Sequence, residues 1–288
     1  MKKILTTLSI LLLINPVYAF DFQSYIAEYK AENEVKSVKR FLEKQADYAN
    51  RSNFKKFIST YDEEYVSADG FDKKVFSEMI KDIWSSYKDV DYDINIKKIT
   101  VEDGKAVAEL IETSYAKLSM TDAYKGELKS ESDIIYYLER DNKGTWKITK
   151  DEVLSESTSM LYGAAKGMDI KLIVPEYITP NTDYLATLEF TPPSETFAIA
   201  SLAADKVEFP QKPTKEVFRP LPDDNILERF FTSNNGDANE YVVASIGLTK
   251  TSVDDLSLKF KLTGFGYAIK RVNVVEKNVE GQLNDETK

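Results

Sequence analysis

The spacing of apolar residues changes from a helical period to a period of two near residue 91, and this change limits the possible folds more than any other feature. Between Glu34 and Ala49 the apolar residues are three or four positions apart: Val35, Val38, Phe41, Leu42, Ala46 and Ala49. This spacing places them on one face of a helix. Similar stripes predict a short helix capped by Ser52 and a third helix capped by Asp72. The sequence before residue 91 is therefore predicted to be mainly helical.

Apolar and polar residues alternate after this point, which is typical of strands in an antiparallel sheet. The alternation begins at Tyr92, Ile94 and Ile96. Turns are predicted at Glu102–Lys105, where Gly104 is free to adopt a positive φ, and at Asp141–Gly144. Long strands are predicted at residues 106–118, 127–140 and 145–156. Three helices followed by such strands predict an α+β domain over residues 20–162.

The C-terminal part has a different pattern. Short apolar segments recur about every ten residues, and turn sequences such as Pro192-Pro193 and Asn235-Gly236 separate many of them. This pattern predicts an all-β sandwich domain over residues 168–275. Gly163 and Gly167 flank small residues at the predicted boundary. Residues 276–288 are polar and are expected to form a frayed tail.

The first 19 residues have the pattern of a signal peptide. Lys2 and Lys3 precede the apolar run from Ile4 to Ile14, and Val17-Tyr18-Ala19 supplies a small residue at the cleavage site. A membrane-spanning helix needs about 20 apolar residues, so this run is too short to be an anchor. We expect cleavage after Ala19, no transmembrane segment in the mature chain, and a periplasmic or secreted protein.

Histidine and cysteine are both absent from the 288 residues. Their absence excludes Ser-His-Asp and Cys-His catalysis, His-ligated metal sites and disulfide bonds. The net charge of −10 argues against binding to nucleic acid. Carboxylate, Tyr, Lys or Ser-Lys chemistry, an all-oxygen metal site, or no chemistry remain, and no cofactor is predicted.

Three segments resemble the nuclear-transport-factor-2-like family, also called ketosteroid-isomerase-like or SnoaL-like. They are Ala49-Asn50-Arg51-Ser52-Asn53-Phe54, Tyr61-Asp62-Glu63-Glu64-Tyr65 and Gly144-Thr145-Trp146-Lys147-Ile148. The resemblance covers roughly residues 30–157. It implies a cone in which three helices lie on a curved antiparallel sheet and enclose a pocket. These segments reflect the order of helices and strands and are not catalytic motifs, so the resemblance concerns fold more than function. The predicted C-terminal sandwich is not assigned to a family.

The residues expected to line such a pocket are mainly aromatic. They are Tyr61, Tyr65, Trp84, Tyr115, Ser132 and Tyr136. Aromatic stripes on helices and strands usually belong to a core, so the simpler interpretation is that these side chains fill the cone. Trp84 is expected to be buried between helix and sheet.

Proton abstraction in a pocket of this kind needs a buried carboxylate and an acidic hydrogen-bond donor. Asp62 or Asp69, with Tyr61 or Tyr115, would have to fill these roles. The acids that follow Tyr61 fall between apolar positions, which favours a solvated face. No catalytic residue is therefore predicted. A non-catalytic role is favoured, in which the cone binds a ligand or peptide and the sandwich binds a partner. A carboxylate-based isomerase or lyase and a structural envelope protein are the alternatives.

The segment Asn234–Glu240 has oxygen-bearing side chains at alternate positions, as a calcium-binding loop has. It also joins two predicted strands, and Asn, Gly and Asp are the residues that a hairpin loop requires. The turn interpretation is preferred, and no metal site is predicted.

Overall fold

The computed structural model describes residues 16–121, 124–212, 215–254 and 257–276. Three helices come first: α1 (Pro16–Asn50), α2 (Phe54–Ile58) and α3 (Lys73–Ser86). None of the helices in these residues is long and apolar enough to cross a membrane. The predicted signal peptide overlaps the start of α1, and its residues 1–15 lie outside the described part of the chain.

Polar side chains cap the two shorter helices. Asp72 accepts a hydrogen bond from the Val75 amide at 2.8 Å, which confirms it as the cap of α3. The cap of α2 is Asn53 rather than Ser52, because the Asn53 side chain accepts the hydrogen bond from the Lys56 amide. Ser52 instead has a φ of 48° in the turn between α1 and α2.

The strands of the described residues form two sheets. The larger has the order β1-β2-β3-β4-β12-β11-β8-β9, with β6 beside β12, and the smaller has the order β10-β7-β5. The bounds are β1 (Asp91–Glu102), β2 (Lys105–Thr121), β3 (Tyr124–Arg140), β4 (Trp146–Gly163), β5 (Ile170–Ile173), β6 (Tyr177–Ile178), β7 (Asp183–Phe190), β8 (Phe197–Lys206), β9 (Arg219–Pro220), β10 (Ile226–Thr232), β11 (Glu240–Asp254) and β12 (Ser257–Val274). The two predicted turns are confirmed, with φ of 77° at Gly104 and 74° at Gly144.

The larger sheet contains strands from both halves of the chain, so the prediction of an α+β cone followed by a separate β-sandwich is wrong. Strands hold more than twice as many of the described residues as helices do, and the described N-terminal part lacks the three-helix cone pattern. The strand β4 continues to Gly163 instead of ending near Glu156. Its final residues pair with β12, from Ser157 opposite Lys270 to Gly163 opposite Gly264.

Glycine permits this junction between the two halves. Gly163 has a φ of 58°, and a Cβ at Gly264 would lie 2.5 Å from the Ala165 amide nitrogen. The backbones can approach this closely only because these residues have no side chains. In the sequence the same small residues resemble a linker, yet Gly163 pairs with Gly264, and the larger sheet contains strands from before and after residues 162–168.

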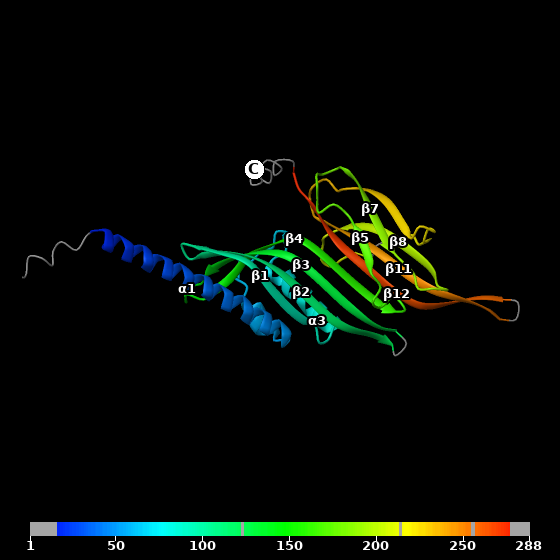
Figure 1. The fold of residues 1–288 in the computed structure, drawn as a ribbon, viewed down its shortest axis with the longest axis horizontal. Coiled ribbons are helices and arrows are strands. Elements are labelled where there is room, and N and C mark those ends of the chain that lie inside the picture. The colour runs from blue at the N-terminus through cyan, green and yellow to red at the C-terminus, as the bar shows by residue number, and fades with distance from the viewer. Residues whose placement is uncertain (1–15, 122–123, 213–214, 255–256, 277–288) are drawn as a thin grey trace, which may run out of the picture.

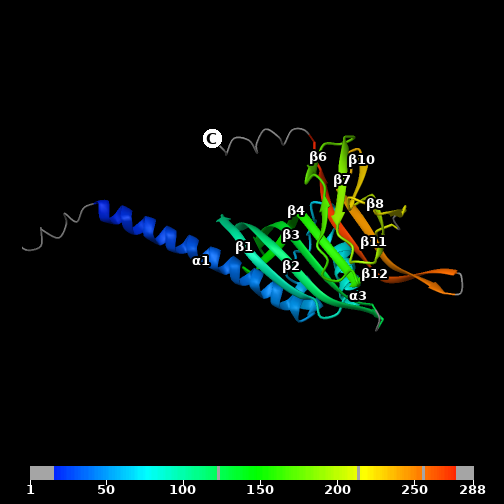
Figure 2. The ribbon, with the colours of Figure 1, turned by 45° about the vertical axis from the view of Figure 1, so that its right-hand side comes forward.

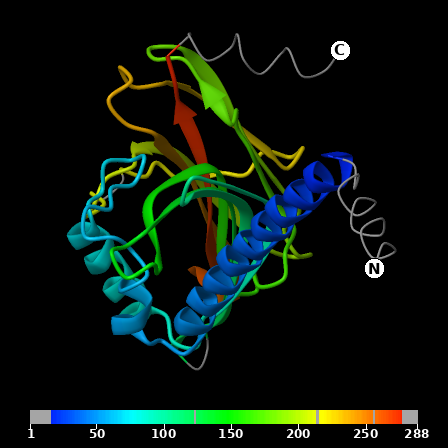
Figure 3. The same cartoon turned by 90° about the vertical axis from the view of Figure 1, so that its left-hand side faces the viewer.

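The larger sheet has a hydrophobic core at each end. At one end the three-stranded sheet packs on β8, β11 and β12, with Leu188 and Leu202 among the buried residues. At the other end, α1 and the segment 61–65 pack on β2, β3 and β4, with Val38 and Leu42 buried. Figures 1 and 2 show the two ends joined through neighbouring strands β4 and β12. Figure 3 shows the strands of the first half curving between α1 on one side and the two shorter helices on the other.

Candidate functional site

A cavity of about 310 Å³ lies against the larger sheet. Its lining comes from α1, α2 and α3, from the segment 61–71, from β1 to β4, and from the C-terminal strands β11 and β12. Small-molecule sites in proteins commonly have this size. Both halves of the chain therefore contribute to one site.

Aromatic side chains form much of the cavity wall. The ring of Tyr61 lies 5.7 Å from that of Phe57 and 4.6 Å from that of Phe76. The ring of Trp84 lies 5.4 Å from that of Phe57, and its Nε1 donates a hydrogen bond to the Tyr92 hydroxyl at 3.0 Å. The wall thus offers apolar surface to a ligand.

The structure brings five of the six predicted lining residues together around the cavity. They are Tyr61, Tyr65, Trp84, Ser132 and Tyr136. The sixth, Tyr115, is 37% exposed and lies in a separate open groove that Lys129 also lines. The five side chains leave an open cavity instead of filling the interior. Trp84 is half-buried rather than buried as expected, because it borders that cavity.

Besides Asp93, which is exposed, and Glu208, which pairs with Lys212, three acids that were not assigned to the pocket from the sequence line the cavity: Glu112, Asp151 and Glu156. Glu112 is the first of these three. Buried residues occupy every second position of β2 before it: Ala106, Ala108 and Leu110. The period of two directs Glu112 to the same face, where it lies opposite Ser132 of β3. Its Oε1 accepts a hydrogen bond from the Tyr136 hydroxyl at 2.7 Å.

Two β-bulges in β4 turn Asp151 and Glu156 toward the cavity. Simple alternation from the buried Ile148 would not direct Asp151 inward. The pairing of β4 with β3 shifts register twice, however, so Asp151 lies opposite Tyr136 and Glu156 lies opposite Ser132. Each extra residue in a strand reverses the alternation beyond it, and bulges often re-aim side chains in this way near active sites.

Burial raises the pKa of all three carboxyls. The pKa of Asp151 rises to about 6, mainly because burial removes water, while the neighbouring Tyr65 hydroxyl opposes the rise. Burial also raises the pKa of Glu112 and of Glu156, and the hydrogen bond from Tyr136 opposes this rise at Glu112. A carboxyl whose pKa lies near neutrality can accept and release a proton at physiological pH.

The tyrosine hydroxyls of the cavity are kept protonated. Burial raises the pKa of Tyr61 and of Tyr136, and the nearby carboxylate of Glu112 raises both further. Burial raises the pKa of Tyr65 as well, and the carboxylate of Asp151 adds to the effect. A protonated phenol can donate a hydrogen bond, so these side chains are donors beside the acids.

Three buried polar atoms of the cavity residues have no hydrogen-bond partner among the described residues: Gln45 Nε2, Tyr65 Oη and Asp151 Oδ1. Gln45 is 4% exposed and Tyr65 is 1% exposed. The Tyr65 hydroxyl lies beside Asp151 without forming a hydrogen bond of ordinary geometry. Buried polar groups are normally paired, so these atoms indicate a place for a polar group of a ligand or for water.

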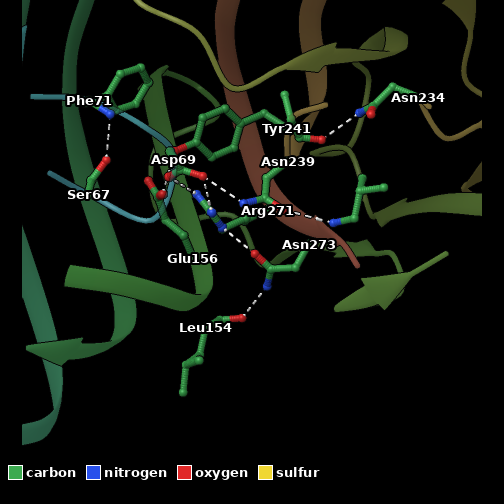
Figure 4. A network of polar contacts seen from close by, with 12 residues as sticks. Ser67, Asp69, Phe71, Leu154, Glu156, Asn234, Asn239, Tyr241, Arg271 and Asn273 are labelled. Atoms are coloured by element: carbon green, nitrogen blue, oxygen red, sulfur yellow. Dashed lines mark hydrogen bonds and ion pairs between the residues drawn. The ribbon is translucent and has the colours of Figure 1, made fainter. Parts of the chain in front are cut away.

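Arg271 borders the cavity from the C-terminal strand β12, where Figure 4 shows its network. Its guanidinium donates to both carboxylate oxygens of Asp69, at 2.9 Å and 2.6 Å, and its Nε donates to Asn273 at 2.7 Å. The Asn239 amide donates a further hydrogen bond to Asp69 at 2.7 Å. The segment that carries Asp69 is therefore fixed by strands from the far end of the chain.

No acid could be assigned to the cavity from the sequence, whereas the structure places Glu112, Asp151 and Glu156 in its lining. Of the two acids considered from the sequence, Asp69 lines the cavity but is paired with Arg271. Asp62 instead accepts a hydrogen bond from the amide of Glu64, two residues further along the chain.

The loop between β10 and β11 is held by hydrogen bonds, as the turn interpretation requires. Glu240 accepts hydrogen bonds from the Asn234 amide at 2.7 Å and from the Tyr184 hydroxyl at 2.9 Å. Lys206 pairs with Asp237 at 2.6 Å. Within the described ranges, no group of three or more His, Cys, Asp or Glu residues is arranged to hold a metal ion.

No known protein family and no curated protein matches the sequence. Among solved structures with a partial likeness, Bd1075 of Bdellovibrio bacteriovorus is 15% identical with a TM-score of 0.35, over 41% of this chain and 40% of Bd1075. The chain thus spans about two fifths of the length of Bd1075. ActVI-ORFA of Streptomyces coelicolor, which has a SnoaL-like fold, is 10% identical with a TM-score of 0.31, over 41% of this chain and 91% of that protein. Both TM-scores are below 0.5, so nothing about activity follows from these likenesses.

Proposed function

We propose that the cavity is the active site of an enzyme that moves a proton within a small apolar substrate, as an isomerase or a lyase does. Asp151 carries this proposal, because burial raises its pKa to about 6 in a cavity that tyrosine hydroxyls also line. A general base is most effective when its pKa lies near the working pH. An ordinary Asp, with a pKa of about 4, is a weaker base.

Asp151 is the general base in this proposal. Its carboxylate removes a proton from a carbon next to a carbonyl group, and negative charge moves to the carbonyl oxygen. The Tyr65 hydroxyl, which has no partner among the described residues, donates a hydrogen bond to that oxygen. The protonated Asp151 then returns the proton to a different carbon in an isomerisation. In a lyase reaction the carbonyl group re-forms, a leaving group on the β-carbon departs with its bonding electrons, and the protonated Asp151 gives its proton to that group.

A β,γ-unsaturated ketone tests this proposal, because its conjugated isomer absorbs ultraviolet light. We expect the mature protein to accelerate the isomerisation of 3-cyclohexenone. Asp151→Asn should lose about 100-fold or more of the rate, since general-base catalysis contributes about that much. Glu152→Gln is the matched control, because Glu152 is the next residue of β4 and does not line the cavity.

Two outcomes would count against an enzyme. Equal rates for the wild type and Asp151→Asn would remove Asp151 from the role of base. Binding of the ketone without turnover by the wild type would favour the non-catalytic role, in which the cavity only holds a ligand.

The proposal places the protein outside the cytoplasm. Its support is the basic start at Lys2 and Lys3, the uncharged apolar run and the small residue Ala19. Mass spectrometry of protein expressed with its leader should find Phe20 as the first residue. A membrane-embedded chain that still begins at Met1 would contradict export by cleavage.

A further inference from the structure

We infer that the molecule bound in this cavity is an apolar amine, whose ammonium group lies over the row formed by Glu112, Ser132 and Glu156. The inference rests on the proposed function only in that it concerns the same cavity. Binding of an amine does not require turnover, so the two ideas can fail separately.

The charges around the cavity favour a cation. Five buried or half-buried acids line it, namely Asp69, Glu112, Asp151, Glu156 and Glu208, and Glu208 is paired with Lys212. Arg271 is the one basic residue among the described lining residues, and both terminal nitrogens of Arg271 already donate hydrogen bonds to Asp69. Glu112, Asp151 and Glu156 therefore form no ion pair among the described residues, although the charge of Arg271 acts on Asp151 and Glu156 from nearby. Buried carboxylates are costly unless a proton or a cation neutralises them.

The sheet fixes where the cation would lie. Ser132 pairs with Glu112 on one neighbouring strand and with Glu156 on the other, so the three residues form one row across β2, β3 and β4. Residues opposite each other in an antiparallel pair have Cβ atoms about 5 Å apart. The two carboxylates thus flank the small Ser132 side chain. The proposed base, Asp151, lies opposite Tyr136, which is four residues beyond Ser132 in β3. Asp151 therefore stays available for proton transfer.

Two buried side chains with unused polar atoms point independently to a polar ligand. Gln45 and Tyr65 line the cavity, are 4% and 1% exposed, and each has an atom without a hydrogen-bond partner among the described residues. An ammonium group carries three N–H donors, which suit carboxylates and the oxygen of the Tyr65 phenol, because that oxygen can accept a hydrogen bond. Gln45 Nε2 is a donor and calls for an acceptor, such as a hydroxyl group, elsewhere on the ligand.

The wall fits the rest of such a ligand. Phe57, Tyr61, Phe76 and Trp84 all line the cavity. The faces of aromatic rings attract cations, and their edges pack against apolar groups. A carboxylate or phosphate ligand would meet three acids and no unpaired basic residue among the described lining residues. The cavity therefore selects against anions.

Three probes of similar size and different charge test the inference: 2-phenylethylamine, 2-phenylethanol and 3-phenylpropionate. Trp84 lines the cavity, and the chain has one other tryptophan. Fluorescence of a Trp146→Phe protein therefore reports binding. We expect the amine to bind at least about tenfold more tightly than the alcohol, a difference of about 1.4 kcal/mol, and the carboxylate to bind most weakly. Calorimetry with the wild type checks the same order.

The double variant Glu112→Gln/Glu156→Gln should lose the preference for the amine and keep its affinity for the alcohol. Retained alcohol binding shows that the variant is folded. Glu139→Gln, which changes an exposed acid paired with Lys105, should leave all three affinities unchanged. The inference is overturned if the amine binds no more tightly than the alcohol, if it does not bind at millimolar concentration, or if the double variant keeps the preference.

The results also separate the inference from the proposed enzyme. Turnover of 3-cyclohexenone without any preference for the amine would remove the inference and leave the enzyme. A clear preference for the amine with no turnover would leave the inference and favour a ligand-binding protein.

Discussion

Arg271 on β12 binds both carboxylate oxygens of Asp69, a residue 202 positions earlier in the chain. The side chain of Arg271 is 1% exposed and that of Asp69 is 10% exposed. Because both partners are buried, loss of one would leave the other charge without compensation. This contact therefore ties the segment that borders the cavity to the last strand of the sheet.

We expect Arg271→Met to lower the free energy of unfolding by about 3–5 kcal/mol, because it leaves Asp69 buried and unpaired. The double variant Arg271→Met/Asp69→Leu should recover much of the lost free energy of unfolding. Urea denaturation measures both effects. Lys105→Met is the control, since it breaks an exposed pair with Glu139 and should cost less than about 1 kcal/mol. Similar losses for Arg271→Met and Lys105→Met would contradict the prediction.

Asp151 should make the folded protein less stable as the pH rises from about 4 to about 6. Its pKa is about 6 in the folded protein, whereas an ordinary Asp, as in the unfolded chain, has a pKa of 3.8. In this range the folded state therefore keeps a proton that the unfolded state has released. The stability that this proton gives is present at low pH and is lost as the pH rises through the folded pKa.

Asp151→Asn removes this titration and should stabilise the protein at pH 8 by about 1–3 kcal/mol relative to wild type. The difference between the two proteins should shrink toward low pH. Urea denaturation of both proteins between pH 4 and pH 8 tests this, because the other acids titrate in both and largely cancel. A difference that does not change with pH would show that the Asp151 pKa is not raised.

Local features of the N-terminal half could be predicted because each depends on a few neighbouring residues. The cap at Asp72 and the turns at Gly104 and Gly144 follow from side-chain chemistry and backbone freedom. The pairing of Gly163 with Gly264 could not be predicted. Glycines that let two strands meet look the same in a sequence as glycines in a linker, and only the distant partner distinguishes them.

The candidate site shows the same limit. Glu112 could have been found by continuing the alternation of Ala108 and Leu110, which directs it inward. Asp151 and Glu156 could not have been found from the sequence, because the two bulges of β4 are consequences of its pairing with β3. A pattern of period two cannot show where an extra residue enters a strand.

Gly163→Ala tests the junction of the two halves. The positive φ of Gly163 and its close approach to Thr263 both oppose a side chain there. Gly144→Ala is the matched control, because Gly144 has a similar φ of 74° and no atom near the added methyl group. The control should cost about 1–2 kcal/mol from its φ alone. Gly163→Ala should cost at least about 2 kcal/mol more by thermal or urea unfolding. Equal costs would show that the close approach does not constrain the sheet.

Tyr65→Phe tests the hydrogen-bond donor and the base together. The rate of 3-cyclohexenone isomerisation by wild type should rise with pH through about 6, because Asp151 must lose its proton and the ketone does not titrate there. The Tyr65 hydroxyl lowers the pKa of Asp151, so its removal should move the inflection to higher pH. The plateau rate should also fall, by about 100-fold if the hydroxyl stabilises the enolate oxygen. Tyr115→Phe is the control, because Tyr115 lies outside the cavity and should change neither quantity. A lower inflection, or an unchanged plateau rate, would remove Tyr65 from the proposed mechanism.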